Sequence, residues 1–421
     1  MSRTALVTGL GFITSIGNDR ASVTASLRTL RPGIERIEFL GNPDLPVRVA
    51  GTVKDFSVDS PSWRDWRFPA RYPIPRETLR GLSPHGVYAI CAAEQALEDS
   101  GLSREAITDG ATGLYCASAG SAFFLHHHLA QMHAARGERC YPLGVVASIA
   151  GTLNFNLAAH YGIRGAVGGF VAACASSSHA LGCALDDIRL GRQTRMLVVG
   201  AEEVTADTLL PFAAMRALST NSDPATASRP FDRERDGFVG AGGAVCLILE
   251  EAETARRRGA PIYAELAGWG QAADGYNVAI SHPEGAGLAE AIRRALADAQ
   301  VSPGEIDYVN AHATSTPAGD RSEALALRTV FSAVKAHPQV SSTKGLTGHP
   351  LSMSGVMEAA FCSLALRDGF IPGNANLVEP DEACEGLDIP RTTMDAAPKI
   401  VLNNSSGFGG SNVCHVLKRA D

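Results

Sequence analysis

A cysteine in the segment Phe170-Val-Ala-Ala-Cys-Ala-Ser-Ser-Ser has the setting of a nucleophile. The segment predicts a short apolar strand, a sharp turn at Cys174 and a helix whose apolar positions include Leu181 and Leu185. A thiol at the start of a helix faces unpaired backbone N–H groups, which favour the thiolate and can bind an oxyanion. An arbitrary free cysteine is more often an inert buried side chain. The small residues on both sides of Cys174 favour the nucleophile.

Two histidines follow in the second half of the chain. His312 ends an apolar run and precedes a polar loop rich in Ser and Thr, where a single histidine is more often a packing or capping residue. Lys344 and His349 precede a predicted helix that carries Glu358. Because a lysine near a helix N-terminus opposes the helix dipole, we expect Glu358 to be its ion-pair partner.

A fourth segment, Asn403-Asn-Ser-Ser-Gly-Phe-Gly-Gly-Ser-Asn, predicts a turn rich in glycine. Such a turn presents backbone N–H groups, and this one adds a single aromatic ring, Phe408. Each of the four segments is a weak signal when taken alone.

Alternating strand-like and helix-like runs must position these residues. Strand-like runs at 4–7 and 112–117 and an amphipathic helix at 84–99 have second-half counterparts in a helix at 287–300 and a strand at 306–310. This alternation is an α/β pattern. Because 421 residues exceed what one hydrophobic core usually supports, we expect two halves. Residues 1–260 would carry Cys174, and residues 261–421 would carry His312 and His349.

A weak internal repeat relates the two halves. Thr4-Ala-Leu-Val-Thr-Gly-Leu-Gly corresponds to Ile262-Tyr-Ala-Glu-Leu-Ala-Gly-Trp-Gly, and the run that follows Cys174 corresponds to the run that follows His349. Duplicated βαβ units would place their corresponding loops side by side across a pseudo-two-fold axis. The repeat therefore predicts that Cys174, His312 and His349 meet at one site.

Composition excludes several classes of protein. A hydrophobic content of 45% and a charged content of 19% fit a globular enzyme, and a formal charge of −7 argues against a nucleic-acid-binding surface. The N-terminal apolar run breaks at Gly9 and Gly11, too early for a signal peptide, and we find no membrane span. The nine cysteines are scattered without a C-x-x-C pair, so we expect no disulfide framework, no zinc site and a cytoplasmic location.

In this order and at these separations the four segments resemble the β-ketoacyl synthase family, in its elongating, acyl-carrier-protein-dependent class within the thiolase superfamily. Further matches are Val7-Thr-Gly-Leu-Gly and the stretch from Ala214 to Val239, so the resemblance covers essentially the whole chain. It implies a thiolase-like fold, in which two pseudo-repeated βαβ halves give a layered α-β-α-β-α sandwich. It also implies an acyltransferase, a 3-oxoacyl-carrier-protein synthase of fatty acid or type II polyketide or polyene synthesis. This enzyme condenses malonyl-carrier protein with an acyl chain by a decarboxylative Claisen reaction.

The resemblance also assigns roles to individual residues. Cys174 would carry the acyl chain, His312 and His349 would complete the Cys-His-His set, and the Lys344–Glu358 pair would support them. The backbone N–H groups of Cys174 and Phe408 would form the oxyanion hole, with the Phe408 ring as a gate. Thr314 and Thr316 would hold the phosphopantetheine arm. This arm arrives on the carrier protein, so no tightly bound cofactor is expected.

Two departures from the family pattern concern the walls of the site. Ala313 stands where the family usually has Gly, and Ser352-Met-Ser-Gly replaces a Gly-Ala-Ala-Gly run. We expect Ala313 and Met353 to line or support the acyl channel and to change the preferred substrate. The sequence does not give the acyl length.

Arginines supply the predicted docking surface for the acidic carrier protein. They are clustered in a chain whose net charge is negative, as electrostatic steering requires, although most such clusters are only solvated faces. The set is Arg64, Arg67, Arg71, Arg76, Arg80, Arg136 and Arg139. A run of histidines, His126 to His128, invites a metal, but consecutive histidines cannot converge on one ion and we predict none.

Two other functions stay open beside the condensing enzyme. A thiolase acting on coenzyme A esters uses a second cysteine as a base, and the Phe408 turn has none. A non-catalytic subunit that shapes the tunnel of a ketosynthase heterodimer loses the nucleophile, whereas this chain keeps Cys174 and both histidines. We expect a homodimer or a heterodimer with a subunit of the chain-length-factor kind, and neither nucleic acid nor membrane as a partner.

Overall fold

A mixed ten-stranded sheet organises the protein. The structure, a computed structural model, describes residues 3–37, 47–138, 140–333 and 337–420. The strands lie in the order β10-β9-β11-β12-β8-β1-β7-β6-β4-β5. Their bounds are β1 (Ala5–Ile13), β4 (Thr112–Ala117), β5 (Val167–Phe170), β6 (Arg195–Glu202), β7 (Gly243–Glu251), β8 (Ala264–Ala273), β9 (Tyr308–Asn310), β10 (Gln339–Ser341), β11 (Ile400–Gly407) and β12 (Ser411–Lys418). Strands β2 (Ile34–Arg36) and β3 (Val49–Gly51) form a separate ribbon.

The sheet is symmetric about the pair β8 and β1, which meet over three residues, with Ala5 opposite Leu266. Outward from β1 and outward from β8, the first two strand pairings are antiparallel and the last two are parallel. Strand β1 thus corresponds to β8 and β4 to β9, which confirms the internal repeat predicted from the sequence. The predicted boundary at residue 260 falls between α10 (Ala252–Arg257) and β8.

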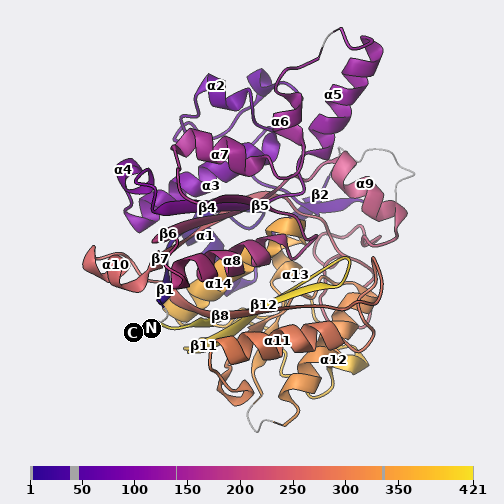
Figure 1. Cartoon of the computed structure of the whole chain (residues 1–421). Helices are drawn as coiled ribbons and strands as arrows, with labels where there is room; N and C mark the ends of the chain where they lie inside the picture. Colours follow the sequence, from indigo (N-terminus) through magenta and orange to yellow (C-terminus); the bar gives the residue numbers. More distant parts are fainter. Residues whose placement is uncertain (1–2, 38–46, 139, 334–336, 421) are drawn as a thin grey trace.

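Helices cover both faces of the sheet and fill the space between its halves. Helices α3 (Pro84–Ser100) and α7 (Leu153–Tyr161) lie on one outer side, and α11 (Ala286–Asp298) and α12 (Pro317–Phe331) lie on the other. Helices α8 (Ser176–Arg189) and α14 (Ser354–Asp368) contact strands of both halves and form the middle layer of the thiolase-like sandwich (Figure 1). The remaining helices of four or more residues are α1 (Arg20–Thr29), α2 (Arg76–Leu79), α4 (Arg104–Ile107), α5 (Ala122–Ala134), α6 (Gly144–Ser148), α9 (Ala206–Ala214), α10 and α13 (Lys344–Thr347).

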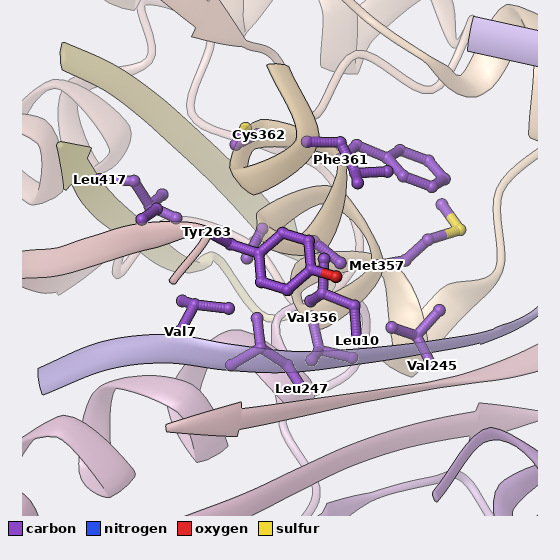
Figure 2. Packing of buried hydrophobic residues seen from close by; sticks show 14 of the residues in the cluster. Val7, Leu10, Val245, Leu247, Tyr263, Val356, Met357, Phe361, Cys362 and Leu417 are labelled. Carbon is purple, nitrogen blue, oxygen red and sulfur yellow. The ribbon is translucent and has the colours of Figure 1, made fainter. Parts of the chain in front are cut away.

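Helix α14 is buried on all sides, from Ser354 to Leu366. Figure 2 shows Val356, Met357 and Phe361 of this helix packed against strands β1 and β7, through side chains that include Leu10 and Val245. A helix that is apolar all round needs such a position. Any polar group that α14 carries is therefore held in the interior.

Strand β1 is longer than the sequence predicts. We expected the strand to stop near Gly9 and Gly11, but it runs to Ile13. A Cβ at position 11 would lie 1.8 Å from the Ala92 carbonyl oxygen, and a Cβ at position 9 would lie 2.5 Å from that of Ala96. The two glycines therefore allow α3 to lie directly on the strand. No helix in the described part of the chain is long and apolar enough to cross a membrane.

Candidate active site

A strained turn presents Cys174 between β5 and α8. Ala173, just before the cysteine, has a φ of 48°, in the left-handed region that residues with a side chain rarely adopt. The Ser176 hydroxyl stabilises the turn, because it accepts the Ala172 N–H at 2.7 Å and donates to the Ala173 carbonyl at 2.6 Å. Helix α8 then begins at Ser176. The predicted turn and helix are present, whereas the strand before them, β5, ends at Phe170, where the predicted strand was expected to begin.

The Cys174 sulfur faces an imidazole and two backbone N–H groups. Its Sγ lies 3.0 Å from His349 Nε2. The N–H groups of Cys174 and Phe408 hydrogen-bond to the sulfur and, with the charge of Lys344, favour the thiolate. Burial outweighs them and raises the pKa of the Cys174 thiol to about 12. The resting group is therefore a neutral thiol, not the thiolate expected from the helix N-terminus alone.

Both imidazoles are buried, and they lie beside one another. The rings of His312 and His349 are 5.2 Å apart and nearly perpendicular. Burial, with a second contribution from the nearby charge of Lys344, holds the pKa of each histidine well below its usual value of about 6.5. Each ring is therefore neutral at physiological pH and carries one N–H donor and one acceptor nitrogen.

A buried carboxylate holds the loop of His312. Glu323 of α12 accepts the backbone N–H groups of His312 and Ala313 at 2.9 and 2.7 Å. The Asn404 side chain of β11 donates to the same carboxylate at 3.0 Å. Asp320, one turn earlier on α12, similarly accepts the N–H groups of Ser315 and Thr316. Neither carboxylate could be predicted from the sequence, because the backbone N–H groups that they accept leave no pattern in side-chain types.

Lys344 and Glu358 form an ion pair in the interior, and both side chains are fully buried. Lys344 lies at the start of α13, and Glu358 lies on the buried helix α14. Burial raises the pKa of Glu358 even with the ammonium group beside it. The contact that the sequence predicts between these two residues is present.

A cavity of about 330 Å³ joins these groups to the surface. Its lining includes Cys174, His312 and His349, and also Thr314 and Thr316, whose hydroxyl oxygens are 3.1 Å apart. Phe408 borders the cavity with 37% of its surface exposed. Ala313 lines the cavity too, whereas Met353 is fully buried against Gly200. The cavity thus has polar groups and an aromatic ring around the Cys174 thiol.

Two family models together match most of the chain. The N-terminal domain of β-ketoacyl synthase matches residues 3–255, and the C-terminal domain of β-ketoacyl synthase matches residues 263–378. The chain belongs to the β-ketoacyl synthase family. It is 38% identical to the 3-oxoacyl-[acyl-carrier-protein] synthase 1 of Haemophilus influenzae, over 99% of both chains.

Solved structures are similar to this β-ketoacyl synthase over its full length. The ishigamide ketosynthase/chain length factor matches with a TM-score of 0.89 and 31% identity over 100% of both chains. A type II PKS acyl-carrier protein in complex with its ketosynthase, bound to the hexaketide, matches with a TM-score of 0.86 and 28% identity, again over 100% of both chains.

The arginines of the predicted docking surface are not the ones found at the cavity of this ketosynthase. Arg64, Arg67, Arg71, Arg76, Arg80 and Arg136 do not line it, and Arg139 lies outside the described residues. None of the six has a carboxylate partner within the part of the chain that the structure describes. The arginine at the cavity is Arg216, which is exposed and which the sequence analysis did not select, although it lies in the matching stretch 214–239.

The histidine run on α5 points in different directions. His126 Nδ1 lies 3.1 Å from an oxygen of Asp207, while the His128 ring stacks on Tyr141. Among the described residues no three metal-ligating side chains gather in one place.

Proposed function

We propose that this ketosynthase carries an acyl chain on Cys174 and extends it with a malonyl unit delivered by a carrier protein. The observation that supports this most directly is the contact of 3.0 Å between Cys174 Sγ and His349 Nε2, with two backbone N–H groups at the same sulfur. A nucleophile, a proton acceptor and oxyanion donors are thus in place for acyl transfer.

The first step transfers the acyl group. As the sulfur attacks the acyl thioester carbonyl, the Cys174 proton passes to His349 Nε2, which a neutral imidazole can accept. The N–H groups of Cys174 and Phe408 stabilise the oxyanion. Collapse of the intermediate breaks the old C–S bond, and the departing carrier thiolate takes the proton back from His349.

The second step uses the imidazoles as donors. The N–H groups of His312 and His349 bind the thioester oxygen of malonyl-carrier protein, and loss of CO₂ leaves an enolate at that oxygen. The enolate carbon attacks the acyl thioester on Cys174. Breaking the C–S bond releases the Cys174 thiolate, which takes a proton from water to return to the resting thiol. Lys344 favours the condensation step as a whole, because its charge helps to keep the His312 and His349 rings neutral.

Carrier proteins supply both acyl groups in this proposal. Thr314 and Thr316 would contact the phosphopantetheine arm, which arrives with the carrier, and no further cofactor is required. Arg216 and the arginine cluster 64–80 would attract an acidic carrier surface. The complex of a ketosynthase with its acyl-carrier protein in a similar solved structure supports this partner.

A second ketosynthase subunit is the other proposed partner. Strand β5 ends the sheet, so its outer edge has no strand neighbour among the described residues. Val167 and Val171 at this edge and Phe155 of α7 are exposed apolar residues. A free edge bordered by apolar side chains favours association with another subunit. We propose a homodimer or a heterodimer with a chain-length-factor-like subunit.

The competing functions are less well supported. A thiolase needs a second cysteine as base, and Cys174 is the one cysteine among the described residues that line the cavity. A non-catalytic tunnel subunit would not need the buried Lys344–Glu358 pair beside two neutral imidazoles. The retained Cys174 favours an active subunit.

The proposal can be tested by intact mass spectrometry. The protein is incubated with a panel of acyl-carrier proteins and then with malonyl-carrier protein. We expect one acyl group on wild type and none on Cys174→Ser, followed by a carrier-bound product two carbons longer. Acylation of Cys174→Ser to the wild-type extent would place the nucleophile elsewhere, and condensation with coenzyme A esters alone would favour the thiolase.

A further inference from the structure

The nitrogen of His349 that faces away from Cys174 contacts a hydroxyl. His349 Nε2 lies 3.0 Å from the Cys174 sulfur, and Nδ1 lies 3.2 Å from Ser354 Oγ. Ser354 is fully buried at the first position of α14. It belongs to the Ser-Met-Ser-Gly segment at which the sequence departs from the family pattern. Among the described residues it is the hydrogen-bond partner that the structure gives to Nδ1.

Close packing fixes the position of Ser354. A Cβ at position 355 would lie 1.8 Å from Ser178 Oγ, so the start of α14 lies directly against α8. The Val356 N–H donates to Ser177 Oγ at 3.1 Å. Because α8 directly follows Cys174, the cysteine, His349 and Ser354 belong to one packed unit. The hydroxyl is therefore held at the imidazole and not only near it.

The proposed reaction requires two tautomers of His349. Acyl transfer needs an Nε2 without a proton, so that it can accept the Cys174 proton, and the neutral ring then carries its proton on Nδ1. Condensation needs an Nε2–H that donates to the substrate oxygen, and Nδ1 then has no proton. A hydroxyl accepts a hydrogen bond from Nδ1–H and donates one to bare Nδ1, whereas a carboxylate or a backbone N–H serves one tautomer only.

We propose that Ser354 is a positioning residue that stabilises both tautomers of His349 by reversing its hydrogen bond between acyl transfer and condensation. Between the two steps the ring gives its Nδ1 proton to water and takes one at Nε2 from water, so the exchange consumes no proton. This inference rests on the proposed function, because the two steps define the two tautomers. It also implies that the steps respond differently to loss of the hydroxyl. Without the Ser354 hydroxyl, the Nδ1–H tautomer that acyl transfer needs has a buried donor with no partner. The tautomer that condensation needs has only an acceptor with no partner at Nδ1, which costs less.

The test compares Ser354→Ala with Ser363→Ala. Ser363 is a fully buried serine on the same helix, and its hydroxyl bonds to the Ala359 carbonyl at 2.8 Å, away from the imidazoles. Acyl transfer to Cys174 is measured in a single turnover by intact mass, and malonyl decarboxylation is measured separately, each from pH 6 to 9. Losing a hydrogen bond worth about 1–1.5 kcal/mol predicts roughly tenfold slower acyl transfer in Ser354→Ala, with decarboxylation within about twofold of wild type.

Ser354→Cys supplies a rescue, since a thiol is a weak donor and a weak acceptor. We expect its acyl-transfer rate to lie between those of wild type and Ser354→Ala, and it keeps the test available if the alanine variant does not fold. Equal loss of both steps, or the same loss in Ser363→Ala, would assign Ser354 a purely structural role and overturn the proposal. If wild type itself is not acylated on Cys174, the proposed function fails; if wild type and Ser354→Ala react alike, this inference alone fails.

Discussion

Gly407 lies directly against the backbone of Cys174. A Cβ at position 407 would lie 3.1 Å from the Cys174 nitrogen and 2.8 Å from the Ala172 oxygen. Only a glycine therefore lets the end of β11 approach the nucleophile turn. This approach also places the Phe408 N–H at the sulfur. In the proposed function the two turns, from opposite halves of the chain, make one oxyanion site.

Gly407→Ala should therefore separate the Phe408 N–H from Cys174. We expect acyl transfer to fall by roughly 10²-fold, the usual effect of losing one oxyanion donor. The rate of acyl transfer is measured in a single turnover, with intact mass spectrometry as the readout. Alkylation of Cys174 by iodoacetamide is the control for access to the sulfur. It should fall much less than acyl transfer, because the Phe408 N–H is only one of several groups that favour the thiolate. If acylation keeps its wild-type rate, the Phe408 N–H has no part in the oxyanion site.

His312→Ala and His349→Ala should differ in the step that each affects. Both remove a donor to the malonyl thioester oxygen, so decarboxylation should fall by roughly 10²-fold in each. Acyl transfer should suffer more in His349→Ala, because His349 and not His312 contacts the Cys174 sulfur. Acylation and CO₂ release are measured separately. The opposite order of acylation rates in the two variants would contradict this division of roles.

The pH dependence of Cys174 reactivity follows from its raised pKa. With a pKa of about 12, the thiolate fraction grows roughly tenfold per pH unit from pH 7 to 10. Alkylation by iodoacetamide should therefore keep rising from pH 7 to 10. An ordinary thiol levels off above a pKa of about 8.5. A plateau below pH 9 would show that the thiolate is already formed at rest.

The buried ion pair should matter for stability. Glu358→Gln leaves the Lys344 ammonium buried without a carboxylate, and such changes lower the free energy of unfolding by about 3–5 kcal/mol. The double variant Lys344→Met/Glu358→Gln removes both charges and should be more stable than the single variant. Urea unfolding at pH 7.5 measures the free energy of unfolding of both variants. A double variant less stable than Glu358→Gln would mean that the carboxylate contributes through contacts other than the ion pair.

Much of the site could be predicted because its reactive groups lie in short continuous segments. Cys174, His349 and Phe408 each stand in a recognisable run of neighbours, and the repeat brought two of these runs together. The resting state of the thiol could not be predicted, since its pKa depends on burial by residues from other segments. Glu323 escaped notice because it binds backbone N–H groups. The role of Ser354 could not be predicted either, because its contact with His349 depends on how closely α8 and α14 pack.

Docking of the carrier protein is the prediction for which the sequence and the structure favour different places. The sequence selects the cluster 64–80, which carries Arg76 and Arg80 on and beside α2, whereas the structure places Arg216 at the cavity. The unpaired arginines of the cluster fit a surface that attracts an acidic partner. Arg216 lines the same cavity as Cys174, which the pantetheine arm of the carrier would enter. We therefore expect both surfaces to contribute to steering.

Charge reversal separates the two surfaces. Arg76→Glu/Arg80→Glu and, separately, Arg216→Glu should each raise the KM for acyl-carrier protein, because charges at the rim of an interface mainly change the association rate. Wild type should lose affinity steeply between low and high salt, and both variants should show a flatter dependence.

Arg293→Glu on α11 is the control, since Arg293 is an exposed arginine on the outer helix layer and away from the cavity. KM is measured at two ionic strengths, with iodoacetamide alkylation of Cys174 to confirm unchanged chemistry. A salt dependence in Arg76→Glu/Arg80→Glu equal to that of wild type and of the control would make the cluster an ordinary solvated face and leave Arg216 as the docking residue.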